Sequence, residues 1–333
     1  MAEQQKKEFT TALSQWSKEV TGLVTRDFES VGVSFDEYAK TCAMNAMSSI
    51  FNLVQQTDKA SLSQMDTSNI REVVAQAASL KLNANSVPRE CYFQLRNKKL
   101  GDNWVKVVEM GIEGNGNDAM LRNFGVDVKT VYPCWLVKEG DAFTYPKRKG
   151  LKTEPPEWEE KGLSNKVVRV VYPILLNDGT EQYLISERDS VMVNLFAHVR
   201  SNLTNETFGI CENVRKATPE QKEQIEAKKE EVYEALRKCK TVDERLACEI
   251  ARPYMSPAWL DTPESMIIRK MRNNAIKPFP KDMNAIAKRS MLELDETYKA
   301  SRDEIAEEAN VEEFDDTEVI DAEVVEVEGG EAD

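Results

Sequence analysis

Basic and aromatic side chains are interleaved in several parts of the sequence and together could bind a nucleic acid. Cations neutralise phosphates, and flat rings and guanidinium planes stack on bases, so this mixture is typical of proteins that bind single strands. Charged strand edges and aromatic cores give a similar composition in ordinary α+β proteins, so composition alone does not decide between the two. The candidate DNA-binding residues are Tyr92, Phe93, Arg96, Lys98, Lys99, Lys106, Arg122, Lys129, Lys147, Arg148, Lys149, Arg269, Lys270 and Arg272.

A short cluster of carboxylates with one lysine offers a different chemistry. Glu157, Glu159 and Lys161 could surround a magnesium ion in a nuclease. They lie in a polar stretch, where interspersed glutamates and lysines usually form a solvated surface, and no second carboxylate motif falls on a neighbouring predicted strand. We therefore expect a surface here and keep the magnesium-dependent nuclease as a less favoured alternative.

The sequence has little material for other catalytic or cofactor sites. Its one histidine, His198, is expected on the inward side of a helix, which leaves almost nothing for a histidine metal site or a catalytic triad. The glycine cluster 111–116 lacks the lysine and the spacing of a nucleotide-binding loop. We expect a protein that is not an enzyme and uses no cofactor or metal. Six widely spaced cysteines predict buried thiols instead of zinc ligands or disulfides: Cys42, Cys91, Cys134, Cys211, Cys239 and Cys248.

The net charge of -14 is concentrated at the C-terminal end of the chain. Residues 303–333 hold fifteen of the 58 acids and no Lys or Arg, so the remaining 43 acids nearly balance the 44 bases. A block of like charge with few aromatics cannot bury enough surface to fold, and we expect a disordered acidic tail. Its simplest role is solubility. The alternatives are an interaction tail or a mimic of DNA that competes for a basic groove.

Membrane segments are not expected. No stretch approaches the roughly 18 consecutive apolar residues that a membrane span needs. The first residues, Met-Ala-Glu-Gln-Gln-Lys-Lys, lack the apolar run of a signal peptide. We expect a cytoplasmic protein with no membrane partner.

The N-terminal part of the sequence has helical periodicity. One helix is expected over 6–24, a second from a Ser34 cap to Val54, and a third after Asp66. We expect residues 1–62 to form a helical segment that makes oligomer contacts. The third helix has a narrow apolar face, expected to lie in the core, formed by Ile70, Val73, Val74, Ala77 and Ala78.

The middle of the sequence has the composition of antiparallel strands. Turn residues 139–141 predict one hairpin, and Asn177-Asp178-Gly179-Thr180 predicts a second. The polar segment 146–165 between them is expected to be a long excursion from the sheet. Strands are expected over 90–96, 103–110, 126–137, 142–145, 167–176 and 181–185.

Helices return after residue 185. Ser186 with Asp189 forms a cap-like pair, and Thr218-Pro219-Glu220-Gln221 is a capping box that opens an inserted helical hairpin over about 217–252. Helices are also expected over 261–277 and 282–298. The whole pattern predicts an α+β fold, with a small antiparallel sheet of β-hairpins packed with helices, a helical N-terminal part and a disordered acidic C-terminal tail. Its domains would be a helical segment 1–62, a core 63–282, a C-terminal helix 283–302 and a tail 303–333.

The order of these motifs resembles the RecT family of phage single-strand annealing proteins, over roughly residues 69–282. Residues 70–83 are similar to the family's alanine-rich helix, and 91–98 stand in the place of its Y-L-I-P-Y strand. Residues 105–114 stand where the family has an apolar strand and G-Y-K-G, although Ile112 and Glu113 replace its tyrosine and lysine. The most specific match, to an S-P-W..D...M signature, is formed by Ser256, Pro257, Trp259, Asp261, Met266, Arg269 and Lys270.

The resemblance implies a recombination protein that binds single-stranded DNA, holds an annealed duplex intermediate and works without ATP. It also implies a homo-oligomeric ring or helical filament, a partner exonuclease and a host single-strand binding protein. Pairing of complementary strands is downhill in free energy, so a protein need only neutralise phosphates and raise the effective concentration of the strands.

A different class of function remains open from the sequence. Helical termini and an acidic tail also suit a phage structural or scaffolding protein. Assembly that requires DNA favours the annealing protein, and assembly indifferent to DNA favours the scaffold.

Overall fold

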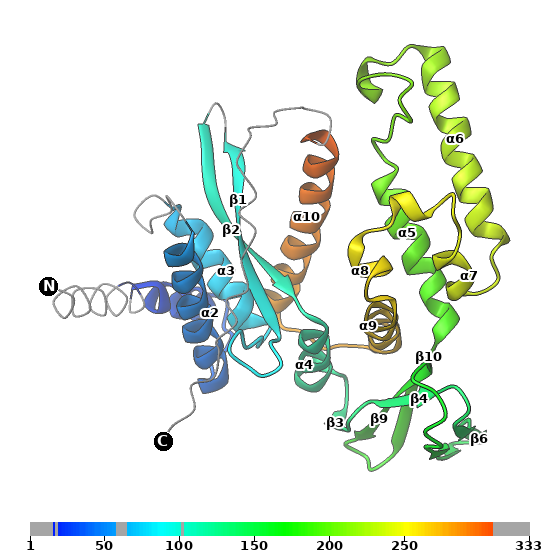
Figure 1. Cartoon of the computed structure of the whole chain (residues 1–333). Helices are drawn as coiled ribbons and strands as arrows, with labels where there is room; N and C mark the ends of the chain where they lie inside the picture. Colours follow the sequence, from blue (N-terminus) through cyan, green and yellow to red (C-terminus); the bar gives the residue numbers. More distant parts are fainter. Residues whose placement is uncertain (1–15, 17–18, 58–64, 101–102, 309–333) are drawn as a thin grey trace, which may run out of the picture.

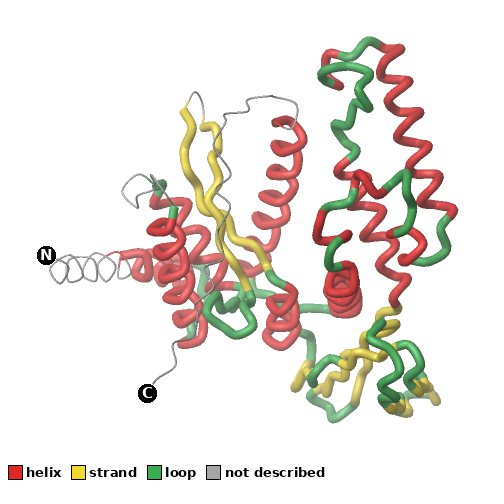
Figure 2. Tube along the Cα trace, in the orientation of Figure 1, coloured by secondary structure: helices red, strands yellow, loops and turns green. Residues whose placement is uncertain are grey.

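The computed structural model describes residues 16, 19–57, 65–100 and 103–308, which form the mixed α+β fold that the sequence predicts (Figures 1 and 2). Two hydrophobic clusters divide these residues into two lobes that lie side by side. The hairpin lobe contains the N-terminal helices, strands β1 (Cys91–Leu100) and β2 (Asn103–Ile112), and helix α10 (Ala285–Glu308). The sheet lobe comprises residues 126–281.

The hairpin lobe begins with a helix over 19–30, followed by α2 (Glu37–Gln56) and α3 (Thr67–Ser79). The Asp36 carboxylate caps α2 by accepting the Ala39 N–H at 2.8 Å, so the predicted Ser34 cap is wrong. The predicted third helix is confirmed as α3, and the Asp66 carboxylate caps it by accepting the Ser68 N–H. The predicted helical residues 6–15 lie outside the described residues.

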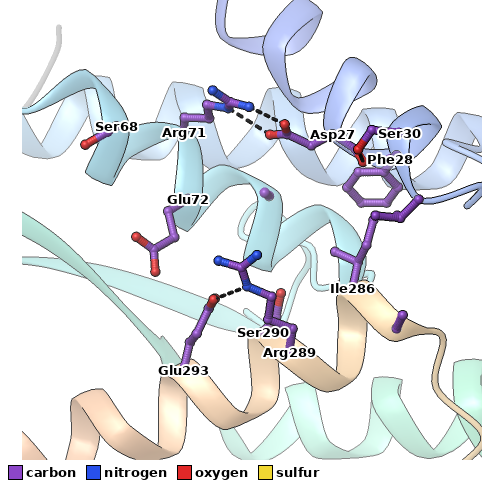
Figure 3. A pocket seen from close by; sticks show the side chains of 13 residues that line it. Asp27, Phe28, Ser30, Ser68, Arg71, Glu72, Ile286, Arg289, Ser290 and Glu293 are labelled. Atoms are coloured by element: carbon purple, nitrogen blue, oxygen red, sulfur yellow. Dashed lines mark hydrogen bonds and ion pairs between the residues drawn. The ribbon is translucent and has the colours of Figure 1, made fainter.

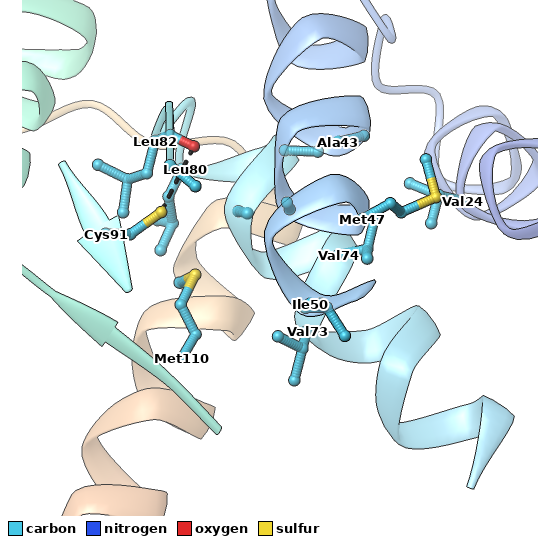
Figure 4. Packing of buried hydrophobic residues seen from close by; sticks show 14 of the residues in the cluster. Val24, Ala43, Met47, Ile50, Val73, Val74, Leu80, Leu82, Cys91 and Met110 are labelled. Atoms are coloured by element: carbon cyan, nitrogen blue, oxygen red, sulfur yellow. Dashed lines mark hydrogen bonds between the residues drawn. The ribbon is translucent and has the colours of Figure 1, made fainter. Parts of the chain in front are cut away.

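The apolar face predicted for α3 is confirmed as core. Val73 and Val74 face Met47 and Ile50 of α2 (Figure 4), and α3 also packs against β2 and α10. The N-terminal helices therefore share one core with the β-hairpin, whereas the sequence suggested a separate N-terminal segment. All five residues of this face are buried: Ile70, Val73, Val74, Ala77 and Ala78.

Strands β1 and β2 form a long antiparallel hairpin whose register runs from Cys91↔Ile112 to Leu100↔Asn103. Successive side chains of a strand point to opposite faces. Phe93 and Leu95 pack on the hairpin-lobe core, so Tyr92 and Arg96 lie on the other face.

Helix α4 (Gly114–Phe124) follows β2 and joins the two lobes (Figure 1). Its residues Met120 and Phe124 belong to the hairpin-lobe core, and Leu121 belongs to the sheet-lobe core. The chain crosses between the lobes twice, and the two crossings run antiparallel. The Val126 N–H donates to the Pro280 carbonyl at 3.0 Å, and the Asp282 N–H donates to the Phe124 carbonyl at 2.7 Å.

The sheet lobe is built on β9 (Val167–Leu176), and the predicted hairpin between β9 and β10 (Glu181–Glu187) is confirmed. The other long edge of β9 pairs with two short strands, β3 (Val128–Val131) and β4 (Trp135–Lys138). The sequence predicted one continuous strand over 126–137, which is wrong because the strand is interrupted between these two segments.

The hairpin predicted across residues 139–141 does not form. The Asp141 carboxylate accepts hydrogen bonds from the Lys138 and Lys161 N–H groups and from Trp158 Nε1, which turns the chain away from β4. As a result β5 (Ala142–Thr144) pairs with β8 (Glu157–Glu159). Within the predicted excursion, β6 (Lys147–Lys149) and β7 (Lys152–Glu154) form a further small hairpin.

Helix α9 packs against β9 and β10, and the other helices of the sheet lobe share its hydrophobic core. The predicted capping box at Thr218 and Gln221 is confirmed, and α6 packs on α5, as does α7, instead of forming a helical hairpin with α7. Ser186 and Asp189 do not cap α5. Asp189 accepts the Val242 N–H at the start of α7 instead. The helices are α5 (Met192–Asn202), α6 (Pro219–Lys238), α7 (Val242–Leu246), α8 (Pro257–Leu260) and α9 (Pro263–Ile276).

The last helix, α10, runs past the predicted end at residue 302 to Glu308. Residues 303–308, predicted as the start of the acidic tail, are therefore helical, and residues 309–333 lie outside the described residues. Among the described helices, none combines the length and the apolar character needed to cross a lipid bilayer.

Candidate nucleic-acid interface

The candidate residues on the β1–β2 hairpin have different surroundings. Phe93 packs partly against the hairpin-lobe core and also lines a pocket between α2 and β1. Arg96 is 26% exposed and forms an ion pair with Glu109 at 3.0 Å. Lys98 is exposed and Lys106 is half-buried, and neither has a carboxylate within 4 Å among the described residues. The side chain of Lys99 lies outside the described residues.

Tyr92 has the most defined setting of the aromatic candidates. Its ring covers Gly111 on the neighbouring strand so closely that a Cβ there would lie 2.1 Å from the ring. The guanidinium of Arg89 lies 5.9 Å from the ring centroid and pairs with Glu113 at 3.2 Å. The glycine in this part of the 111–116 cluster therefore makes room for a ring, not for a phosphate.

A pocket of about 240 Å³ opens beside Tyr92, between α2 and β1. The side-chain amides of Asn52 and Gln56 and the guanidinium of Arg89 contribute to its wall. Amides and a guanidinium can hydrogen-bond to the edge of a base, and an adjacent ring offers a stacking surface. This pocket is the part of the hairpin lobe best suited to a nucleobase.

Helix α9 carries three candidate cations with different surroundings: Arg269 and Arg272 lie toward α4, whereas Lys270 lies near His198 of α5. Arg269 is exposed, and its Cγ would lie 3.5 Å from a Cβ at Gly114, the first residue of α4. Lys270 is half-buried, and burial together with the positive charges of Arg269 and Lys277 lowers its pKa. Both lack a carboxylate within 4 Å among the described residues.

Arg272 is occupied within the protein. Its guanidinium pairs with Asp118 of α4 and donates to Tyr172 Oη at 2.8 Å and to Asn115 Oδ1 at 3.2 Å. Tyr172 also donates to Asp118 at 2.8 Å. These bonds tie α9 to α4 and β9, so Arg272 holds the lobes together and is not available as a free phosphate ligand.

The remaining candidate cations lie on β6, β3 and α4. Lys147 and Arg148 of β6 are exposed without a carboxylate within 4 Å among the described residues, and Lys149 pairs with Glu154 at 2.6 Å. Lys152, opposite Lys149 in the register, was not predicted because the β6–β7 pairing was not. Two further candidates are exposed, Lys129 on β3 and Arg122 of α4, which lies 3.6 Å from Glu90. The predicted residues are thus spread over both lobes instead of one groove.

Sequence reasoning missed an aromatic cluster on the outer face of the β9 sheet. The rings of Trp135 and Trp158 are stacked with centroids 5.7 Å apart, and Tyr183 lies 6.3 Å from Trp135. Nearby, the Arg169 guanidinium lies 4.4 Å from the ring of Tyr145 and pairs with Glu187. The cluster joins residues from four strands, so no local sequence pattern marks it.

The carboxylate cluster considered for a nuclease is a surface. Glu157 and Glu159 are exposed on β8, and Glu159 pairs with Lys161 at 2.6 Å. Across the described ranges, no group of three or more metal-ligating side chains is close enough to hold an ion.

The single histidine has a structural setting, as predicted. His198 Nε2 accepts the Ser256 N–H at 3.0 Å, and its ring lies 6.1 Å from that of Trp259, which is buried in the sheet-lobe core. Burial and the positive charge of Lys270 lower the pKa of His198. The histidine therefore holds Ser256, the N-cap residue of α8.

Another pocket in the hairpin lobe lies apart from the candidate residues. It has a volume of about 420 Å³ and lies between the 19–30 helix, α3 and α10 (Figure 3). Arg71 there is bound to Asp27, and Arg289 to Glu293 at 2.5 Å, while Glu72 adds a further carboxylate. A phosphate chain has little to gain from a pocket whose cations are already neutralised.

Comparison with known proteins does not assign the chain to a family. No protein family model matches the chain, and no curated protein is significantly similar to it. The arrangement of charges and rings on the two lobes therefore carries the functional argument.

Proposed function

We propose that the protein binds single-stranded DNA and promotes the pairing of complementary strands during homologous recombination. One observation carries the proposal: several exposed or half-buried cations of the described chain have no carboxylate within 4 Å, although acids are as common as bases in residues 1–302. Those among the candidates are Lys98, Lys106, Lys129, Lys147, Arg148, Arg269 and Lys270.

The free cations are suited to phosphates because binding there costs no existing ion pair. Each phosphate neutralised releases condensed counterions, which favours binding at low salt. The pocket beside Tyr92 and the ring itself supply a place for a base, which favours single strands over duplex. A single strand of DNA that crosses the α4–α9 contact could meet free cations on both lobes.

The proposed activity requires no catalytic group. Pairing of complementary strands is downhill, so the protein would act by holding strands extended and close together. By the resemblance to the RecT family, we propose that it works in the cytoplasm as a homo-oligomeric ring or filament. A partner exonuclease would supply the single strand, and a host single-strand binding protein would compete for it.

Fluorescence anisotropy with a labelled oligonucleotide tests the binding. We expect log K to fall linearly with log[salt], with a slope of about -0.7 for each phosphate neutralised. In a second assay, two complementary oligonucleotides carrying a donor and an acceptor dye should pair faster with the protein than without it. No binding at low ionic strength, or pairing at the unassisted rate, would refute the proposal.

A magnesium control separates the nuclease alternative. The labelled oligonucleotide should keep its full length after incubation with the protein and Mg²⁺, because Glu157 and Glu159 are not arranged as a metal site. Cleavage that disappears in Glu157→Gln/Glu159→Gln would favour the nuclease.

A further inference from the structure

The two edges of the β1–β2 hairpin differ in their hydrogen bonds to the rest of the chain. On the β2 edge, the Asn69 side chain acts like a neighbouring strand, because its Nδ2 donates to the Val108 carbonyl at 3.1 Å and its Oδ1 accepts the Val108 N–H at 2.7 Å. Further along, Tyr298 Oη of α10 accepts the Ile112 N–H at 3.0 Å. The β2 edge is therefore closed at two points.

The β1 edge has no such hydrogen-bonded cover among the described residues, although α2 packs against β1 near Phe93, where the two elements line a pocket. In an antiparallel pair, residues opposite each other alternate between exchanging hydrogen bonds and pointing their backbone groups outward. The backbone N–H and C=O groups of Val108 point outward from β2, and Val108 lies opposite Leu95. The backbone groups of Leu95 therefore point outward from β1. Those of Phe93 and Asn97, two residues to either side, point the same way. Within the described part of the chain, these outward N–H and C=O groups have no hydrogen-bond partner.

The charge of β1 restricts what could add to this edge. The strand carries Arg96, Lys98 and Lys99 and no acid. A second copy of β1 would bring like charges together, which is destabilising for directly opposed side chains. An acidic extended segment would instead be attracted along the whole strand.

The chain contains such a segment beyond α10. Residues 317–328, Thr-Glu-Val-Ile-Asp-Ala-Glu-Val-Val-Glu-Val-Glu, carry five acids and no base. Half of them are β-branched (Thr, Val and Ile), the types enriched in strands, and Gly329-Gly330 follow as a strand terminator.

The segment can reach the edge within one chain. In Figure 1, α10 runs alongside the hairpin toward its tip, which places Glu308 at the tip end. Residues 309–316 can span about 26 Å when extended, whereas neighbouring strands lie only about 5 Å apart. The connection is therefore long enough to pass around the hairpin from the β2 side to the β1 side.

We propose that residues 317–328 add to the free edge of β1 as a third strand of the same chain. Their backbone would pair with the outward groups of Phe93, Leu95 and Asn97, and their carboxylates would lie beside Arg96 and Lys98. The inference goes beyond nucleic-acid binding and is tested without DNA.

Hydrogen exchange of the full chain, followed by mass spectrometry of peptides from 91–98, tests the strand. We expect the amides of Phe93, Leu95 and Asn97 to exchange at least tenfold more slowly in the native chain than in Val324→Pro/Val325→Pro. Adjacent residues of a strand point their N–H groups to opposite edges, so one of the two prolines must remove a donor to β1. Peptides from 105–112 should not change and serve as the internal reference.

The matched control is Glu331→Pro/Ala332→Pro, which places two prolines in the same tail but outside the segment. It should exchange like the native chain. Equal exchange in the native chain and both variants would overturn the proposal. Protection that rises with protein concentration and survives Val324→Pro/Val325→Pro would also overturn it, because a second copy would then occupy the edge.

Discussion

The α4–α9 contact and the β6–β7 hairpin are both rich in cations but use them in opposite ways. At the contact, Arg272 is held by Asp118, Asn115 and Tyr172, and its side chain is only 27% exposed. On β6, Lys147 and Arg148 are exposed without a carboxylate partner in the described structure. Partners and burial, not the number of cations, therefore decide whether a basic segment stabilises the fold or remains available to a ligand.

Other buried cations of the sheet lobe follow the pattern of Arg272. The Arg188 side chain is 10% exposed and pairs with Asp243 and Glu264, and it donates to the Val167 carbonyl at 2.9 Å. Removing one partner of such a group leaves the other buried without compensation, which costs more than an exposed ion pair is worth.

The largest effect is expected for Gly116→Ala, where α4 packs against the two ends of the β1–β2 hairpin at Glu90 and Ile112. A Cβ there would lie 2.2 Å from the Glu90 carbonyl oxygen, which is backbone and cannot turn aside. We expect a loss of about 3 kcal/mol in the free energy of unfolding, measured with urea. Gly114→Ala is the control, because its nearest neighbour is Arg269 Cγ at an ordinary 3.5 Å. A similar loss in both variants would show that helix α4 itself, and not its contact, is sensitive.

The next effect is expected for Arg272→Ala, which leaves Asp118 and Tyr172 without their cation. We expect the free energy of unfolding to fall by about 2 kcal/mol, less than for a fully buried pair because both side chains are partly exposed. Lys277→Ala, an exposed cation just after the same helix, should unfold like the native chain. If Arg272→Ala weakens DNA binding without loss of stability, our assignment of this residue to the fold is wrong.

Lys147→Ala/Arg148→Ala should reverse this pattern. We expect unfolding to change by less than about 0.5 kcal/mol, as for most surface substitutions, and the salt slope of single-strand binding to become shallower by about 1.4. The control is Lys138→Ala/Lys161→Ala, which also removes two cations, but ones paired with Glu160 and Glu159 at 2.6 Å. Equal slopes for the two double variants would mean that general charge, not free cations, sets the binding.

The smallest effect is expected from the protonation of His198. Its pKa is lowered in the folded protein, so the unfolded chain binds the proton more readily. The neutral ring contributes its full stabilisation above the pKa of histidine in the unfolded chain, about 6.5, and this stabilisation is lost as the pH falls below that pKa. His198→Gln keeps an acceptor for the Ser256 N–H and should flatten this part of the pH dependence of the melting temperature. A steeper loss in the variant would place the titration on another group.

The sequence predicted elements whose signals are local. The capping box at Thr218, the hairpin turn at 177–180 and the apolar face of α3 each depend on residues close together in the chain, and all three are confirmed. The inward histidine also followed from helical spacing. The α+β class could therefore be predicted from these elements.

What could not be predicted depends on long-range partners. Asp141 redirects the chain after β4 through bonds to Trp158 and Lys161, so the expected hairpin at 139–141 gives way to the β5–β8 pair. Phe93 is partly buried because its face of β1 meets the hairpin-lobe core, which the strand pattern alone does not fix. Whether Arg272 is free depends on Asp118, a residue more than 150 positions away.

The position of α10 has a consequence for the order in which a newly made chain can fold. Ala287 and Leu294 of this helix complete the hydrophobic cluster begun by residues 19–124, whereas the other cluster is encoded without interruption between residues 121 and 276. During synthesis, all residues of the sheet-lobe cluster leave the ribosome before α10 does, so this cluster can form first. The hairpin-lobe cluster cannot be completed until α10 has emerged. Until then the N-terminal helices expose an apolar surface, and a chaperone can bind this surface during that interval.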